Sequence, residues 1–350
     1  MKVIQMRKVG GPEVLEVVEK PLPEPAAGEA RVRAQAIGIS SADMLVRKGV
    51  YSWMPPLPAI PGNEMAGTVE ALGPPPTTPA LRATPPQAGG ESVVRVGQRV
   101  LVSSRELLFR GGCYAESICV PAEALFPLPD AIAPNDAVSL PNYQLAGALL
   151  YESGVRKPRS IVAYGASGGV GMALIQLAKC DGISGIGIVS TEEKRAFAQR
   201  AGIEHVLIRG KDDLRERVMA LTGGRGVDVV YAMAGPAAQF IGNLDLLAPY
   251  GTVISFATLG GPIPDADLFG ELKKRQEKCL GVRCYSIHSL DHDRELRRAL
   301  MGRAIELMAS GRLRPPPPTL LPLAEAARAH ELMEAGRTLG KVVLVPDLTR

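Results

Sequence analysis

Two patterns of apolar and polar positions divide the chain. Up to residue 130, short apolar runs such as KVIQMRKV and ARVRAQAIGI are bounded by Gly and Pro, which predicts a mostly β region. After residue 130, apolar runs such as SIVAYG alternate with segments in which apolar residues recur at helical spacing. This alternation predicts an α/β fold with a doubly wound parallel sheet, the Rossmann arrangement, over residues 131–290.

The end of the chain is predicted to return to the first region. Residues 293–311 have helical spacing, LPLAEAARAHELMEAG predicts a short amphipathic helix, and KVVLVP predicts a final strand. We therefore expect residues 1–130 and 291–350 to form one β-rich catalytic domain. The proline-rich stretch 74–92 predicts an exposed loop.

Composition narrows the class of protein and its partners. The chain has 350 residues, 46% hydrophobic and 22% charged, which is typical of a soluble globular protein of two domains. The net charge of +4 is spread along the chain, so we expect no nucleic-acid partner. No apolar stretch is long enough to span a membrane, and the N-terminus lacks the apolar region of a signal peptide. With five scattered cysteines, this predicts a cytoplasmic protein with free thiols and no membrane partner.

A glycine-rich turn separates an apolar strand from an apolar helix in SIVAYG-ASGGVG-MALIQLAK. Such a turn lets the backbone approach a pyrophosphate, and the helix N-terminus supplies oriented N–H groups and partial positive charge. It predicts a dinucleotide site; the alternative is a turn that uses small residues only for packing. The candidate cofactor-binding residues here are Ala166, which replaces the usual first glycine, Ser167, Gly168, Gly169, Val170 and Gly171.

The end of the second Rossmann strand indicates which dinucleotide is expected. NAD-preferring folds place Asp or Glu about 20 residues past the turn, whereas this chain has Ser190, followed by Lys194 and Arg195. A hydroxyl and cations suit a 2′-phosphate, so NADPH is the expected cofactor. Glu192 and Glu193 intervene, but at a helix start they favour the helix dipole. The alternative is a plain surface helix with Ser190 as its cap.

The chain also resembles a known family nearly end to end. It is similar to the zinc-independent medium-chain dehydrogenases/reductases of the quinone oxidoreductase (zeta-crystallin-like) branch. Besides the glycine turn, the segments that carry the resemblance are GGPEVLEVVEKPLPEPAAGEARVRAQAIGIS, SADMLVRKGVYSWMPPLPAIPGNEMAGTVEALG, GGCYAESICVPAEALFPLPD and GRTLGKVVLVP. The resemblance implies a GroES-like catalytic domain, a homodimer built through the nucleotide-binding domains, and an active site in the cleft between the two domains. It implies hydride transfer from NADPH to a small conjugated acceptor.

The resemblance also implies that no metal is bound. Zinc-dependent members place a Cys where this chain has Ser40-Ser41, and a His where it has Asn63 before Glu64. The four clustered cysteines of their structural zinc lobe have no counterpart here.

Without zinc, hydrogen-bond donors must polarise the acceptor. Tyr51 aligns with a cleft tyrosine of the enoyl-thioester reductases of this superfamily, so it is a candidate to donate to the enolate or supply a proton. The alternative for Tyr51 is a packing role. Ser41 stands where the family has an Asn facing the nicotinamide, and its hydroxyl is the second catalytic candidate.

Other polar residues of this region are expected to be structural. Asp43 and Arg47 lie four apart, as an ion pair on one helix would. Glu64 is expected to be a buried, hydrogen-bonded carboxylate. The histidines fall in no motif and are expected at surface or core positions: His205, His288, His292 and His330.

Further positions bear on the cofactor through the resemblance. Arg209 replaces a Tyr near the adenosine and is a candidate ligand of the 2′-phosphate. Phe256 lies in SFATLGG, which matches the loop that the family places beside the nicotinamide. Lys341 in GRTLGKVVLVP is the last candidate cofactor-binding residue. Leu145-Ala146 and Ala232 depart from the family, which has Thr-Ala and Asp at these positions.

These observations support one leading hypothesis, a zinc-free, NADPH-dependent reductase of quinones or α,β-unsaturated carbonyls. One alternative is an enoyl-thioester reductase of a fatty-acid or polyketide-type pathway. Another, motivated by the departures at Ser41, Leu145 and Ala232, is an NADPH-binding member with altered or no redox activity in a biosynthetic pathway. The physiological acceptor is left open.

Overall fold

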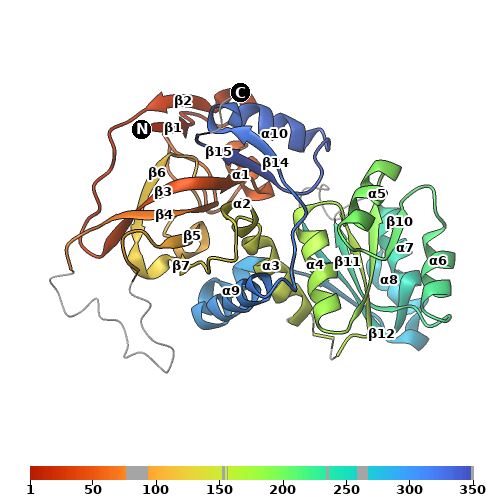
Figure 1. Ribbon diagram of the computed structural model, residues 1–350. Helices are drawn as coiled ribbons and strands as arrows, with labels where there is room; N and C mark the ends of the chain where they lie inside the picture. Colours follow the sequence, from red (N-terminus) through yellow and green to blue (C-terminus); the bar gives the residue numbers. More distant parts are fainter. Residues whose placement is uncertain (76–93, 152–153, 156, 234–235, 258–266, 348–350) are drawn as a thin grey trace. The chain divides into compact units, whose positions relative to one another are not determined.

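The computed structural model describes residues 1–75, 94–151, 154–155, 157–233, 236–257 and 267–347 (Figure 1). It contains two compact units, Met1–Pro141 with Pro317–Arg350, and Asn142–Pro316. The prediction that both chain ends form one domain is thereby confirmed. Most of the predicted loop at 74–92 lies outside the described residues.

The second unit is built on a six-stranded parallel sheet with the order β10-β9-β8-β11-β12-β13. In this order the first strand of the unit, β8, lies between the second and the fourth, which is the Rossmann order. The predicted doubly wound sheet is therefore confirmed. Its strands are β8 (Ser160–Tyr164), β9 (Ser184–Val189), β10 (His205–Ile208), β11 (Val227–Met233), β12 (Leu247–Ala257) and β13 (Gly281–Cys284).

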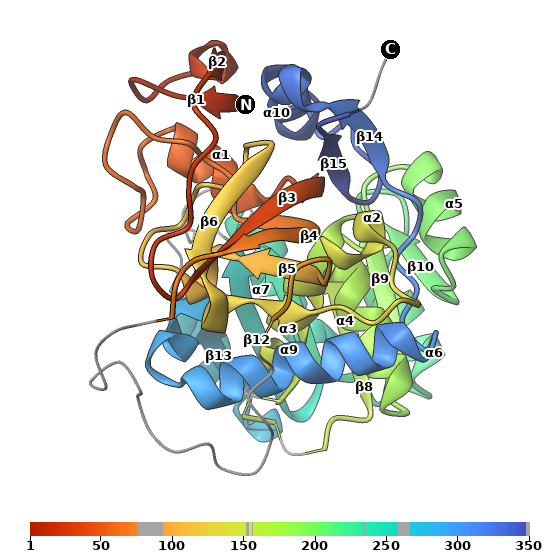
Figure 2. The same cartoon turned by 60° about the vertical axis from the view of Figure 1, so that its left-hand side comes forward.

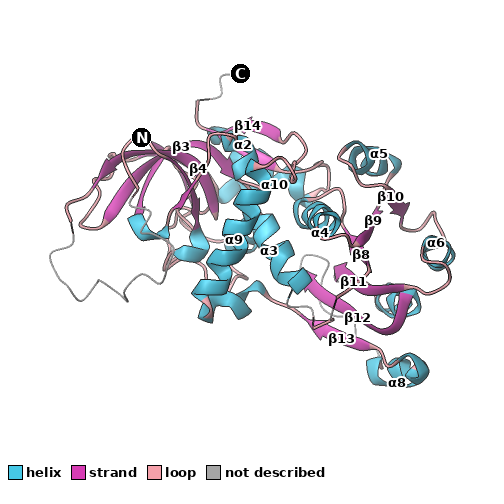
Figure 3. Ribbon diagram, turned by 60° about the horizontal axis from the view of Figure 1, so that its bottom comes forward, coloured by secondary structure: helices cyan, strands magenta, loops and turns pink. Residues whose placement is uncertain are grey.

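Helices cover both faces of this sheet (Figure 3). They do so because their apolar sides are buried against it, as Val218 of α6 and Phe240 of α7 pack with Val230 of β11. The helices are α3 (Leu140–Tyr151), α4 (Gly169–Cys180), α5 (Glu192–Arg200), α6 (Leu214–Leu221), α7 (Ala237–Gly242), α8 (Leu268–Lys273) and α9 (Arg294–Ala309).

The helix α9 belongs to the second unit, although we expected the return to the catalytic domain to begin at residue 291. Leu300 of α9 packs with Ala148 of α3 in a buried apolar cluster. Helical spacing predicts that one side of a helix is buried, but it does not identify the element that covers this side. The units therefore divide after Pro141 and Pro316 instead of after residues 130 and 290.

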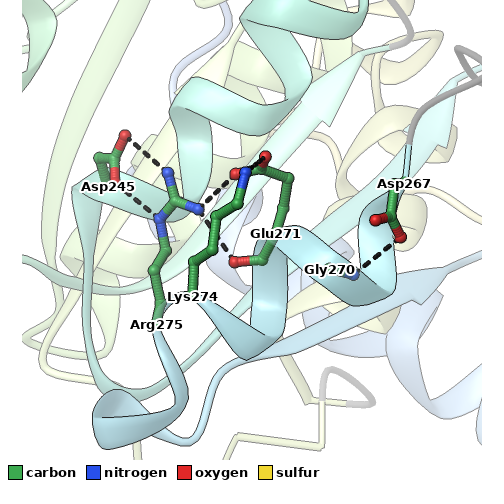
Figure 4. Close-up of polar contacts among 6 residues, drawn as sticks. All are labelled: Asp245, Asp267, Gly270, Glu271, Lys274 and Arg275. Carbon is green, nitrogen blue, oxygen red and sulfur yellow. Dashed lines mark hydrogen bonds and ion pairs between the residues drawn. The ribbon is translucent and has the colours of Figure 1, made fainter.

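A cluster of charged side chains holds α8, where the described chain resumes at residue 267 (Figure 4). The Asp267 carboxylate accepts a hydrogen bond from the Gly270 N–H at 2.8 Å and so begins the helix. Arg275 donates to Asp245 at 2.8 Å and to Glu271 at 2.7 Å, and these bonds raise the pKa of Arg275. The arginine thereby joins the end of α8 to the turn before β12.

The first unit is built on a seven-stranded sheet that the last strand of the chain completes (Figure 2). The strand β15 pairs with β3 in antiparallel register, with Val343 opposite Gly38. Ile4, Met65 and Leu344 are among the residues of the buried core. The strands of this sheet are β3 (Glu29–Gly38), β4 (Glu64–Leu72), β5 (Arg99–Ser103), β6 (Ser117–Pro121), β7 (Phe126–Pro127), β14 (Thr319–Pro322) and β15 (Val342–Val345).

In the described part of this unit, two shorter strands and three α-helices accompany the seven-stranded sheet. The strands β1 (Lys2–Gln5) and β2 (Glu16–Glu19) pair with each other in a two-stranded antiparallel sheet. The helices are α1 (Ser41–Arg47), α2 (Pro134–Ala137) and α10 (Ala326–Glu334).

Two polar side chains of α10, those of the buried His330 and the exposed Glu334, contact the rest of the unit. The Tyr114 hydroxyl lies 3.0 Å from Nε2 of His330, and Glu334 forms an ion pair with Arg47 of α1. His330, Tyr114 and Arg47 are each 0% exposed. Burial lowers the pKa of His330 to about 4, and the charge of Arg47 acts in the same direction. The imidazole is therefore neutral in the folded protein near neutral pH.

We predict that His330 makes the folded state sensitive to acid. Its pKa in the folded protein lies below the ordinary value of 6.5, so the unfolded chain binds the proton more strongly. Stability is therefore lost as the pH falls through 6.5 towards 4, by about 2 kcal/mol between pH 7 and pH 5. Urea unfolding at both pH values measures this loss, and His330→Gln should remove it.

The matched control is His292→Gln, because His292 is exposed. This variant should keep the pH dependence of the wild type. An unchanged pH dependence in His330→Gln would contradict the assignment to the buried imidazole.

Candidate functional site

The predicted dinucleotide turn connects β8 to α4. Gly165 follows β8 with φ of +67°, a left-handed conformation that glycine adopts without strain. The Gly168 N–H donates to the Gly165 carbonyl oxygen at 2.8 Å, which closes the turn. The Ala166 N–H donates to the Ile188 carbonyl oxygen at 3.2 Å and so fixes the turn on β9.

Space around the turn differs from one glycine to the next. A Cβ at Gly171 would lie 2.4 Å from the Gly165 carbonyl oxygen, so α4 approaches β8 too closely for any side chain here. A Cβ at Gly168 would meet only that oxygen, at 3.3 Å, so this side of the turn is open. Gly168 is also the N-cap of α4, and no side chain caps the helix. The free N–H groups of its first turn therefore fit a pyrophosphate.

The other turn candidates are buried or half-buried. Ala166 is 0% and Ser167 6% exposed, so their side chains lie in the interior. A side chain on Gly187 of β9 would lie 2.7 Å from the Ala166 methyl group, which places that methyl against the sheet. Gly169 and Val170 begin α4 and are half-buried.

A hydroxyl and an ammonium group meet after β9. Lys194 Nζ donates to Ser190 Oγ at 3.3 Å, and Ser190 is exposed. The cap of α5 is Thr191, whose Oγ1 accepts from the Lys194 N–H at 3.2 Å. The prediction of a Ser190 cap is therefore wrong, whereas the choice between a plain surface helix and a cofactor contact stays open. Glu192 is turned to Lys211, and this hydrogen bond lowers the pKa of Glu192.

Arg209 lies at the same edge of the sheet, directly after β10. Its N–H donates to the Val189 carbonyl oxygen at 2.9 Å, beside Ser190. Its Nη1 donates to Gln239 Oε1 at 2.9 Å. Burial raises the pKa of Tyr164, the last residue of β8, to about 12, and the positive charge of Arg209 opposes this shift. A cation thus stands near the carboxyl ends of β8 and β9.

In the first unit, α1 begins at a buried carboxylate. Asp43, the third residue of α1, accepts from the N–H of the N-cap residue Ser40 at 2.7 Å, as in a capping box, and also from Ser40 Oγ at 2.9 Å. Asn63 Nδ2 donates to the other Asp43 oxygen at 2.5 Å. Ser104 Oγ in turn donates to Asn63 Oδ1 at 2.5 Å. Burial raises the pKa of Asp43, whereas the donors and the Lys341 charge lower it.

The predicted ion pair between Asp43 and Arg47 is wrong. The spacing of four residues is suitable, but the capping box turns Asp43 towards the helix start. Arg47 instead pairs with Glu334 of α10, which brings a carboxylate to its guanidinium from another part of the chain.

Lys341 and Glu64 form an ion pair in the interior, where they are 6% and 2% exposed. The prediction that Glu64 is a buried, hydrogen-bonded carboxylate is confirmed. Burial lowers the pKa of Lys341 to about 8, although the negative charge of Asp43 raises it in part. Lys341 thus has a structural contact, and its contact with the cofactor stays a prediction.

The two catalytic candidates lie at the two ends of α1. Ser41 is its first residue and is exposed. Tyr51 follows the helix, is half-buried against the core, and has its ring centroid 5.8 Å from that of Trp53. Their catalytic roles stay predictions.

The remaining positions singled out in the sequence lie in the second unit. Phe256 is half-buried near the end of β12, and residues 258–266 lie outside the described residues. Ala232 is 0% exposed in the core, and Leu145 packs against the buried cluster of α3 and α9.

Two polar residues of these sites were not among the sequence candidates. Ser104 holds the amide of Asn63. Asn142 of α3 packs against the glycine turn, since a Cβ at Gly169 would lie 2.3 Å from its Nδ2. Neither residue belongs to a periodic pattern or a motif, so no local signal identifies them.

The described residues were also searched for metal ligands and membrane spans. Among them, no group of three or more His, Cys, Asp or Glu side chains is arranged to hold a metal ion. No helix in the described ranges has the length and apolar character needed to cross a membrane. The five cysteines are free thiols.

Comparison with known proteins places the chain in a family. The family described as the alcohol dehydrogenase GroES-like domain matches residues 26–130, and that described as zinc-binding dehydrogenase matches residues 201–344. The quinone oxidoreductase of Pseudomonas aeruginosa is 34% identical over 349 residues, which cover 99% of each chain. The chain belongs to the medium-chain dehydrogenase/reductase family, in its quinone oxidoreductase branch.

Solved structures of proteins similar to this medium-chain dehydrogenase/reductase include two with NADPH. The Escherichia coli quinone oxidoreductase complexed with NADPH has 29% identity and a TM-score of 0.79, covering 99% of this chain and 100% of that one. The mycobacterial protein Rv1454c complexed with NADPH has 32% identity and a TM-score of 0.82, with the same coverage.

We predict that this medium-chain dehydrogenase/reductase requires glycine at position 171 for its stability. In Gly171→Ala the new methyl group meets the Gly165 carbonyl oxygen, so α4 must move away from β8. The expected loss of stability is about 1–3 kcal/mol, measured by urea unfolding. Gly302→Ala in α9 is the matched control, because its Cβ would meet nothing within 4 Å. Equal stabilities of the two variants would refute the steric argument.

Proposed function

We propose that the protein is an NADPH-dependent, zinc-free reductase that transfers hydride to a quinone or an α,β-unsaturated carbonyl compound. The proposal is carried by the groups that meet at one edge of the parallel sheet. There the open glycine turn, the Ser190–Lys194 pair and Arg209 follow three adjacent strands. The two NADPH-bound relatives named above support the same cofactor.

We propose that different groups of the chain bind different parts of the cofactor. The N–H groups at the start of α4 would hold the pyrophosphate. Ser190 Oγ, Lys194 Nζ and the Arg209 guanidinium would hold the 2′-phosphate, with two cations against its negative charge. NADPH, when bound, supplies the hydride.

Reduction of a conjugated carbonyl compound places negative charge on its oxygen, and a hydrogen-bond donor stabilises that charge. We propose the Tyr51 hydroxyl as this donor and Ser41 as a second polar group at the acceptor. The hydroxyl of Tyr51 is also the group that would give the proton to the reduced product.

The surroundings of Asn63 support the zinc-free part of the proposal. Zinc-dependent relatives have a His at this position, and zinc prefers Cys, His and carboxylate ligands. Here the Asn63 amide donates to Asp43 and accepts from Ser104, so its polar atoms are engaged within the protein. The homodimer and the cytoplasmic location stay predictions.

A panel of acceptors tests the reductase activity. With NADPH, the wild type should reduce 1,4-benzoquinone and a simple enone faster than crotonyl-CoA, followed by the loss of nicotinamide absorbance. In Tyr51→Phe, kcat for the enone should fall roughly tenfold to a hundredfold, because the charged oxygen loses its donor.

Tyr250→Phe is the control for this substitution, since Tyr250 is 77% exposed in the second unit. Cofactor binding without turnover on any acceptor would favour the non-redox alternative over the reductase. A preference for crotonyl-CoA would favour the enoyl-thioester reductase.

The cofactor preference is tested at Lys194. Removing its ammonium in Lys194→Ala should lower the ratio of NADPH to NADH affinity about tenfold, the loss of one charge-assisted contact. Fluorescence titration with each nucleotide measures the two dissociation constants. Lys211→Ala should leave the ratio unchanged, because Lys211 pairs with Glu192. If the ratio in Lys194→Ala equals that of the wild type, Lys194 does not recognise the 2′-phosphate.

A further inference from the structure

Large apolar side chains are exposed on two loops of the first unit. We call them the apolar loop surface: Val50 (66% exposed), Trp53 (44%), Leu57 (41%), Leu108 (87%) and Phe109 (48%). Contiguous exposed apolar groups are uncommon on soluble proteins and mark binding surfaces. Only 4% of the chain is aromatic, and its single Trp is one of these residues.

The two loops lie side by side and are held by backbone hydrogen bonds. The Arg110 N–H donates to the Trp53 carbonyl oxygen at 3.4 Å, and the Gly112 N–H donates to that of Ile60 at 2.7 Å. A Cβ at Gly111 would lie 3.2 Å from the Pro55 ring, so the chains are in close contact. The apolar side chains of both loops therefore belong to one surface.

The exposed part of both loops is uncharged. Residues 49–58 contain no charged residue. In the other loop Arg105 and Glu106 are half-buried, and Arg110 is 6% exposed with its Nη1 donating to the Ser104 carbonyl oxygen at 2.8 Å. The exposed cation next to this segment, Lys48, is paired with Glu334 at 2.7 Å. These loops therefore offer contacts to an apolar group rather than to a phosphate.

This surface begins at the residue proposed to contact the acceptor. The ring of Tyr51 lies 5.8 Å from that of Trp53 at an interplanar angle of 58°. Resting on the proposed function, we propose that the apolar loop surface binds an apolar substituent of the acceptor, such as an alkyl chain or fused ring of a quinone. Trp53 is then a residue that determines specificity, and the preferred acceptors are lipophilic.

Binding can be tested without turnover because Trp53 is the only Trp of the chain. A decyl-substituted 1,4-benzoquinone should quench Trp53 fluorescence with a saturable dependence, whereas unsubstituted 1,4-benzoquinone should quench it linearly, by collision. Leu108→Ala should raise the dissociation constant of the decyl compound several-fold, and its exposure makes misfolding no concern. Leu72→Ala is the matched control at an exposed site at the far end of β4. Linear quenching by both quinones would overturn the proposal.

Turnover provides the second test. The ratio of kcat/KM for the decyl compound to that for 1,4-benzoquinone should fall roughly tenfold in Trp53→Ala, and Trp53→Phe should restore most of it. Leu72→Ala should leave the ratio unchanged. A ratio unaltered in Trp53→Ala and Leu108→Ala would overturn the proposal. Binding of lipid vesicles or of a second copy of the chain at this surface, in place of the quinone, would also overturn the proposal. If saturable binding is found but no acceptor is reduced, the proposed function fails and the binding surface stands.

Discussion

The first unit depends on an ion pair buried between strands that are far apart in the sequence. Lys341 directly precedes β15, and Glu64 begins β4, opposite Gly38 at the end of β3. A buried charge without its partner costs several kcal/mol, about 3–5 when one partner is removed. The pair is therefore satisfied only when β15 and β4 flank the same end of β3. Since α1 follows β3 directly, the returning chain also fixes the place from which the helix starts.

The polar contacts of two buried charged side chains also fix α1 at both of its ends. The carboxylate of Asp43 caps its first turn and holds Asn63, while Arg47 in its last turn pairs with Glu334. The helix is thus held by Asn63, just before β4, and by Glu334 of α10, from two separate parts of the chain. Tyr51 and the first loop of the apolar loop surface follow this helix within a few residues, so their positions depend on the polar contacts that hold the helix.

The second unit was largely predictable from the sequence, and the contacts of the first were not. Strands and helices that alternate locally obey the topology of parallel sheets, so the Rossmann order and the glycine turn follow from nearby residues alone. The meeting of Lys194 with Ser190 is also local, across one helix turn. By contrast, the partners of Arg47 and Lys341 lie hundreds of residues away, and no periodicity records such a pairing. The assignment of α9 failed for the same reason.

The departures from the family in the second unit have a packing explanation. Ala232 lies in the core around β11, where the carboxylate that the resemblance implies would be buried among apolar groups at a cost of several kcal/mol without a partner. Leu145 contributes to the apolar contacts that hold α9 on α3. Both substitutions replace a polar group by one that suits its apolar surroundings, so they need no change of chemistry to account for them. The groups that would recognise the cofactor lie at the ends of other strands, β8 to β10, and these departures leave that edge unaltered. On the proposed function, selection of the acceptor would then rest more heavily on Tyr51 and on the apolar loop surface beside it.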